Sequence, residues 1–210
     1  MTASLADRFL PAFDVSDEVA VQVSAEPSTV WASLMDADLL EVGRRAPLSG
    51  ALAALRMLPE IVASLLHGER PPTAPERMRL RDLSDLPPTS GGWVLLEERP
   101  GEEIALGLVG KFWRPVIEYA DVPAERFVEF AEPGYAKTVY DLSVHSLEGG
   151  DTLLSGLMRT ATTDEHARRW FRRYWTFGVG SGAHVVVRAL LETVQEDAEA
   201  RHASAGTPGA

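Results

Sequence analysis

The stretch TDEHARRWFRRYWTF (residues 163–177), continued by GVGSG (178–182) and AHVVVRALLETVQEDAE (183–199), decides the fold of this 210-residue chain. Its apolar residues recur at helical spacing, which predicts a long C-terminal helix. Most of the residues before it form short period-two patterns typical of strands, whose apolar faces cannot all be hidden by one another. A long helix rich in Trp, Tyr and Phe is the expected cover for such a sheet.

Glycine interrupts this helix three times within residues 178–182. Together the three glycines cost a helix about 2–3 kcal/mol relative to alanine. In an uninterrupted helix with 3.6 residues per turn, Phe171 before them and Val187 after them would face nearly opposite sides. We therefore predict a break near Gly180 and two helical pieces hinged there. The second piece would pack either on its own subunit or on a second copy in a homodimer.

Composition and charge exclude several classes of function. The formal net charge is −11 and no Lys/Arg-rich block is present, which argues against nucleic-acid binding and against adhesion to an anionic membrane. The arginines at 168–173 are interpreted as a solvated helix face. There is no cysteine, and no H-E-x-x-H or other tight ligand spacing, so neither a disulfide nor a metal is expected.

No cofactor and no membrane span are expected either. The run GVGSGA at 178–183 formally fits a dinucleotide fingerprint, but a helical pattern precedes it where that fingerprint requires a strand. The N-terminus lacks the basic and apolar regions of a signal peptide. The most apolar stretch, residues 51–66, is interrupted by Arg56, Pro59 and Glu60 and is too short to cross a bilayer. The expected location is the cytoplasm.

The pattern along the chain predicts a single α+β domain over residues 15–202, preceded by a leader on the surface (1–14) and followed by a disordered tail (203–210). Alternating valines predict a strand at 17–24. Two shorter helices are expected after it. The first starts within 25–28 and ends within 36–38, and the second covers 47–67 with a kink at Pro59.

From residue 76 onward the period becomes two, which predicts an antiparallel meander. The runs are 77–83, 92–100, 102–113, 117–119, 126–132, 134–147 and 152–162. A curved antiparallel sheet of about seven strands around the C-terminal helix is expected in all.

This order of elements resembles the helix-grip fold of the START/Bet v 1-like (SRPBCC) superfamily. The opening VQVSAEPSTVWASLMD (21–36) looks like the first strand, turn and helix of that superfamily. GKFWRP (110–115), EPGYAK (132–137) and the Thr163-Asp164 pair with the arginine- and aromatic-rich run after it resemble an uncharacterised actinobacterial-type subgroup. In those relatives an acidic–Thr–Arg triplet closes the last strand. Here Leu157-Met158-Arg159 stands in its place, so a role of that acid does not transfer.

The resemblance implies a cavity between helix and sheet that holds an apolar small molecule, such as a lipid, sterol or polyketide. A binding or carrier protein is the leading hypothesis. The alternatives are a polyketide cyclase, aromatase or dehydratase-type enzyme that uses pocket Tyr, His or Glu as acid–base groups, and a protein-interaction module without a small-molecule ligand.

The candidate ligand-binding residues are those expected to line the cavity. On strand 134–147, the alternating apolar side should face inward, which places Thr138 and Tyr140 inside and Asp141 on a polar outer face with His145. The glutamates around the Pro100-Gly101 turn are interpreted as solvated charge. The full set of candidate wall residues is Trp93, Trp113, Thr138, Tyr140, Trp170, Tyr174, Phe177 and His184.

Overall fold

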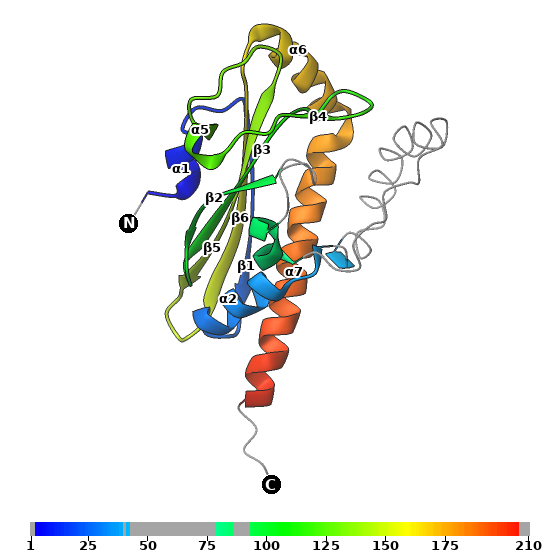
Figure 1. The fold of residues 1–210 in the computed structure, drawn as a ribbon. Helices are drawn as coiled ribbons and strands as arrows, with labels where there is room; N and C mark the ends of the chain where they lie inside the picture. Colours follow the sequence, from blue (N-terminus) through cyan, green and yellow to red (C-terminus); the bar gives the residue numbers. More distant parts are fainter. Residues whose placement is uncertain (1–2, 40, 43–78, 86–92, 206–210) are drawn as a thin grey trace, which may run out of the picture.

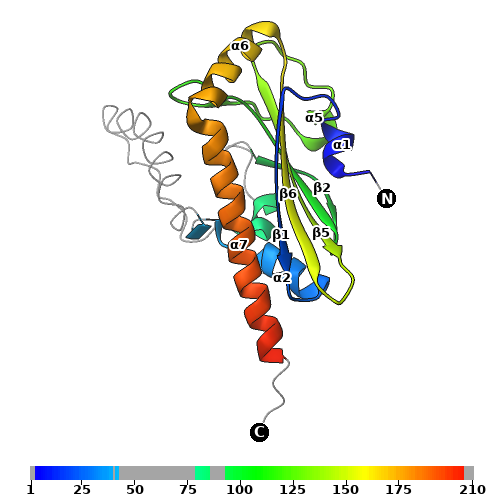
Figure 2. The same cartoon turned by 180° about the vertical axis from the view of Figure 1, so that it is seen from behind.

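The structure is a computed structural model that describes residues 3–39, 41–42, 79–85 and 93–205. The helix predicted at 47–67, with its kink at Pro59, lies outside the described residues. Within them the chain forms one curved antiparallel sheet, a long C-terminal helix across its inner face and a short N-terminal helix on its outer face (Figures 1 and 2). The predicted α+β helix-grip architecture is confirmed.

The sheet has six strands within the described residues, in the order β1-β6-β5-β3-β2, and β4 pairs with β3. All pairings are antiparallel. The strands are β1 (Val15–Val23), β2 (Trp93–Arg99), β3 (Glu103–Lys111), β4 (Glu118–Tyr119), β5 (Ala136–Ser146) and β6 (Thr152–Thr162). Five of them lie where alternating apolar residues predicted a half-buried strand, and β4 is a two-residue remnant of the predicted run 117–119.

Two predicted strands are wrong. In the run 77–83, Arg79 forms only an isolated bridge with Asp38, and a 3-10 helix (Leu80–Asp85) follows. In the run 126–132, the chain instead forms one helical turn, α5 (Ala124–Phe127), because Pro123 starts a helix and the fully buried Phe127 anchors the turn on the outer face of the sheet. The strand predicted over 102–113 ends at Lys111, so Trp113 lies in the turn after it.

The C-terminal helix is interrupted but not broken. It consists of α6 (Glu165–Tyr174), a π-helical turn (Trp175–Val179) and α7 (Gly180–Ala205). The N–H of Gly180 donates to the carbonyl of Trp175, five residues earlier. Such a turn holds one extra residue and rotates the next helical segment by about 100° relative to a regular helix. Because of this rotation, Phe171 and Val187 both face the sheet, although they would point in nearly opposite directions in an ideal helix.

The second half of the helix therefore packs on its own subunit. Val187, Leu190, Leu191 and Val194 are buried in the inner core, together with residues of β1 and of α2 (Pro27–Asp36). Helix and sheet approach closely at Gly156 of β6, where a Cβ atom would lie 2.8 Å from Cγ1 of Val187. The helix also continues through 203–205, where a tail was expected, and residues 206–210 lie outside the described residues.

The N-terminal segment is not a surface leader. Residues Leu5–Phe9 form helix α1, whose Leu5, Ala6 and Phe9 are buried on the outer face of the sheet. Two sheet carboxylates bind the start of this helix: Glu103 accepts a hydrogen bond of 2.7 Å from the Leu5 N–H, and Asp141 accepts one of 2.9 Å from the Ala6 N–H. Both carboxylates are buried, so the expectation of a solvated outer face at these two positions is wrong.

Candidate functional site

Polar side chains cross the inner face of the sheet in two neighbouring rows. Strand register sets Asp17 of β1 opposite Met158 of β6, and Met158 opposite Tyr140 of β5. The adjacent row sets Thr160 of β6 opposite Thr138 of β5. Neighbouring strands are about 4.8 Å apart, so these side chains form one compact group on a face that is otherwise apolar.

The terminal helix contributes a histidine to this group. Nδ1 of His184, on α7, lies 3.0 and 3.1 Å from the two carboxylate oxygens of Asp17. The His184 side chain is 41% exposed and that of Asp17 is 26% exposed, so the pair remains accessible to a ligand or to solvent. His184 thus contacts the first strand of the sheet through Asp17.

Asp17 is the member of this polar group that the sequence pattern did not single out as a candidate. The signal was present in the alternation of β1: Asp17 has the same parity as Val19, Val21 and Val23, which pack into the inner core. A carboxylate on the apolar side of a strand is unusual, and it marks a position where a polar partner or a ligand is needed.

Tyr140 is the central candidate. Its ring packs edge-on against Trp93 of β2, with 5.3 Å between the ring centroids. Burial raises the pKa of the Tyr140 phenol to about 12, and the nearby Tyr174 and Asp17 act in the same direction. The phenol is therefore neutral and can donate a hydrogen bond at physiological pH. Within the part of the chain that the structure describes, the hydroxyl has no hydrogen-bond partner.

Thr138 is buried on the inner face as predicted, but its hydroxyl already has a partner. Oγ1 of Thr138 lies 2.8 Å from Oγ1 of Thr160 on the neighbouring strand. The two hydroxyls satisfy each other, as buried polar groups usually do. Thr138 therefore belongs to the wall of the site, and a ligand would have to disrupt this pair to bind its hydroxyl.

Aromatic residues close the end of the site nearest α6. Tyr174 and Trp113 are half-buried against the cluster of Phe112, Ala136 and Phe171, and the Trp175 ring stacks on Phe171 with 5.8 Å between centroids. The Trp175 indole lies directly on Gly180, where a Cβ atom would come within 2.7 Å of it. Glycine at this position thus allows the π-helical turn to fold its own aromatic side chain against the helix.

Two of the predicted wall residues point away from the sheet. Trp170 is 44% exposed and Phe177 is 86% exposed. Helical spacing alone does not identify which side of a helix faces the sheet when aromatic residues occur on several sides. In this helix, Phe171 contacts the sheet. The assignment of Trp170 and Phe177 to the wall is therefore wrong.

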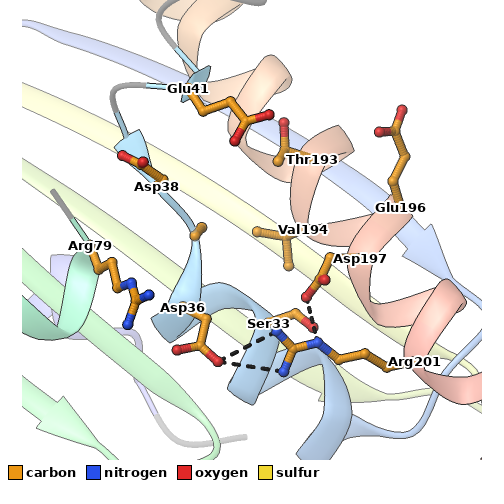
Figure 3. A pocket seen from close by; sticks show the side chains of 11 residues that line it. Ser33, Asp36, Asp38, Glu41, Arg79, Thr193, Val194, Glu196, Asp197 and Arg201 are labelled. Atoms are coloured by element: carbon orange, nitrogen blue, oxygen red, sulfur yellow. Dashed lines mark hydrogen bonds and ion pairs between the residues drawn. The ribbon is translucent and has the colours of Figure 1, made fainter. Parts of the chain in front are cut away.

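A separate groove lies between α2 and the second half of α7, with a cavity volume of about 420 Å³ (Figure 3). Acidic side chains predominate in its wall, from Asp36, Asp38, Glu41, Glu196 and Asp197. Arg201 reaches across it, with Nε 2.7 Å from Asp197 and both terminal nitrogens 3.4 Å from Asp36. These ion pairs tie the two helices together and pair Asp36 and Asp197 with a cation.

The described residues contain no group of three or more His, Asp or Glu side chains placed to hold a metal ion. Among the helices of the same residues, none is long and apolar enough to cross a membrane.

Comparisons with known proteins give only distant similarity. No protein-family model matches the sequence, and no curated protein matches it significantly. Three solved structures illustrate the level of structural similarity.

A conserved protein from Geobacillus kaustophilus is 12% identical, with a TM-score of 0.39, covering 90% of this chain and 97% of its own. The Zhui aromatase/cyclase from Streptomyces sp. R1128 is 14% identical, with a TM-score of 0.28, covering 92% and 99%. An AHSA1-like protein from Rhizobium etli is 15% identical, with a TM-score of 0.26, covering 84% and 85%. These values transfer no activity and no ligand to this chain. Its own six-stranded antiparallel sheet and long C-terminal helix make it an α+β protein of helix-grip architecture.

Proposed function

We propose that this protein binds an apolar, lipid- or polyketide-like small molecule between the inner face of the sheet and the terminal helix. The observation that carries the proposal is the neutral phenol of Tyr140, which has no hydrogen-bond partner among the described residues and lies among the apolar side chains of the inner core. A small number of polar groups on an apolar surface is the usual means of orienting a small molecule.

The surroundings of Tyr140 support this assignment. Trp93, Leu108, Trp113 and Tyr174 are half-buried, in contrast to the fully packed core around Leu154 and Leu191. Partly covered aromatic side chains offer large contact areas to an apolar ligand. The resemblance of the sequence to the START/Bet v 1-like superfamily points to the same class of ligand.

The test combines ligand discovery with one substitution. Native mass spectrometry of protein purified from its own host should reveal a co-purifying molecule, which is then used for titration. Tyr140→Phe should weaken binding about tenfold, since a hydrogen bond contributes about 1 kcal/mol or somewhat more.

Tyr135→Phe is the matched control, because Tyr135 lies on the other side of the sheet against Phe130. Its binding constant should be unchanged. The proposal fails if no molecule co-purifies and a panel of fatty acids and aromatic polyketides produces no thermal shift.

A second candidate function is proton-transfer catalysis of the cyclase or dehydratase type. The Asp17–His184 pair favours it, because a carboxylate bound to Nδ1 orients the imidazole and leaves Nε2 to move a proton. With a polyketide-type substrate, His184→Gln should then reduce kcat by about 10²- to 10⁴-fold while binding changes little. A binding protein would show no turnover to lose and at most a modest change in affinity.

A further inference from the structure

Helix α6 and the π-helical turn that follows it carry exposed basic and aromatic side chains. Arg169, Arg172 and Arg173 are exposed, as are the aromatic side chains of Trp170 and Phe177. Helix α6 lies at the end of the molecule opposite the C-terminus (Figure 1). We call these five residues the basic–aromatic face.

Arg169, Trp170 and Arg173 lie on the same side of α6. At about 100° per residue, Arg169 and Arg173 are roughly opposite the buried Phe171, and Trp170 lies beside them. The guanidinium of Arg173 lies over the Trp170 ring, 5.4 Å from its centroid. The face therefore presents cations and apolar rings together toward solvent.

Acidic side chains near this helix already have other partners. Asp164 caps the helix by accepting from the Ala167 N–H at 2.7 Å, and Asp14 and Glu165 both pair with Arg168. Within the described residues, no acidic group forms an ion pair with Arg169, Arg172 or Arg173. These three positive charges are therefore not offset by direct ion pairs among the described residues.

We propose that the basic–aromatic face docks this protein on an anionic lipid surface. Arginine binds lipid phosphates, and Trp and Phe side chains enter the boundary between headgroups and acyl chains, the combination found on helices that lie in a membrane interface. An acidic peptide would use the arginines but would leave the 86%-exposed Phe177 without an apolar environment. A lipid surface accommodates both kinds of group.

The net charge of −11 does not prevent this docking, although it argued against membrane adhesion when considered alone. At physiological salt, charges are screened over about 8 Å. Glu192, the first acid of α7, lies about 28 Å along the helix from Arg173 at a rise of about 1.5 Å per residue. The acids of α7 therefore contribute little to the field at this face. The proposal is independent of the ligand bound at Tyr140, so each can fail alone.

Co-sedimentation of the full chain with lipid vesicles tests the proposal. We expect binding to phosphatidylcholine vesicles containing about 30% phosphatidylglycerol, much weaker binding to pure phosphatidylcholine, and loss of binding in high salt. Arg169→Gln/Arg173→Gln and Trp170→Ala/Phe177→Ala should each weaken binding at least tenfold. Far-UV circular dichroism confirms that each variant keeps its helix content.

Matched controls lie on the exposed side of α7. Arg188→Gln and Val185→Ala/Val186→Ala change residues that are similarly exposed, and neither should alter vesicle binding. The proposal is overturned if anionic vesicles do not bind, if neutral vesicles bind equally well, or if the control variants lose as much binding as the test variants. Binding to polyglutamate without binding to anionic vesicles would also overturn it, in favour of an acidic protein partner.

Discussion

Nδ1 of His184 lies 3.0 Å from Oδ2 of Asp17, so the terminal helix and the first strand are joined by a polar contact on the inner face of the sheet. The contact sits at the edge of an apolar core, beside the phenol of Tyr140. The contact gives the proposed ligand site a polar end. This end forms only when β1 and α7, which are distant in the sequence, fold against each other.

The Asp17–His184 contact should contribute little to stability. Both side chains are partly exposed, and such pairs contribute about 0–1 kcal/mol. We expect Asp17→Asn, His184→Gln and the double variant to unfold in urea within about 1 kcal/mol of the wild type. A double-mutant cycle that gives a coupling energy of several kcal/mol would contradict this and would make the pair a structural element.

Close approach of helix and sheet at Gly156 should be sensitive to a single methyl group. A Cβ atom at Gly156 would lie 2.8 Å from Cγ1 of Val187 and 3.2 Å from Cδ2 of Leu142. Gly156→Ala should therefore lower the free energy of unfolding by about 1–3 kcal/mol, the usual cost of overpacking a core.

Val187→Ala supplies the internal control for this prediction. It removes the methyl group that the new Cβ would meet, so Gly156→Ala should cost less in the Val187→Ala background than alone. Equal costs in both backgrounds would show that the helix does not pack on Gly156 as described.

The Glu103 carboxylate should make the docking of α1 depend on pH. Burial raises the pKa of Glu103, the hydrogen bond from the Leu5 N–H lowers it, and the neighbouring Asp141 raises it, with a net increase. The folded state therefore holds this proton more tightly than the unfolded chain. The stability from this group is fully present below the unfolded pKa of about 4.3 and is lost as pH rises through the folded pKa.

Urea unfolding midpoints measured from mildly acidic to neutral pH test this. Glu103→Gln should flatten the decline in stability with rising pH, because the titrating group is removed. Glu102→Gln changes the exposed neighbour and should leave the profile as it is in the wild type. An unchanged profile in Glu103→Gln would assign the pH dependence to other groups.

The Asp14 carboxylate should act in the opposite direction. Burial would raise its pKa, but hydrogen bonds from the Thr162 side chain and backbone and the ion pair with Arg168 lower it below the usual value. Its contribution to stability is present above the unfolded pKa of about 3.9 and is lost as pH falls through the folded pKa. Asp14→Ala should cost about 1–3 kcal/mol at neutral pH and less in acid.

Thermal or urea unfolding at neutral pH and near pH 3 measures this difference. Asp7→Ala is the control, since Asp7 also pairs with an arginine, Arg159, but its side chain is 51% exposed. It should change stability by less than about 1 kcal/mol at either pH. Asp14→Ala could instead lower the free energy of unfolding as much in acid as at neutral pH. That result would contradict the interpretation that an ionised Asp14 holds α6 to the end of β6.

Sequence periodicity was sufficient for most of the sheet and for the inward direction of Tyr140. In β1, the valines at 19, 21 and 23 alternate with Ala20 and Gln22, and a period of two identifies both the strand and its buried side. The same alternation assigned Asp17 to the valine side of β1. Its partner could not be found in this way, because His184 is 167 residues further along the chain.

The sequence by itself determined most of the strands, the long terminal helix and the place where that helix is interrupted, because these features depend on the spacing of nearby residues. Only the tertiary structure decided which side of each element is covered. Helix α1 covers the outer face and buries Asp141, and the π-helical turn rotates α7 so that Val187 meets Gly156 while Phe177 faces solvent. A single additional residue in one helical turn sets the rotation of α7. The spacing of apolar residues does not predict this rotation, because the rotation depends on the elements that pack against each side of the helix.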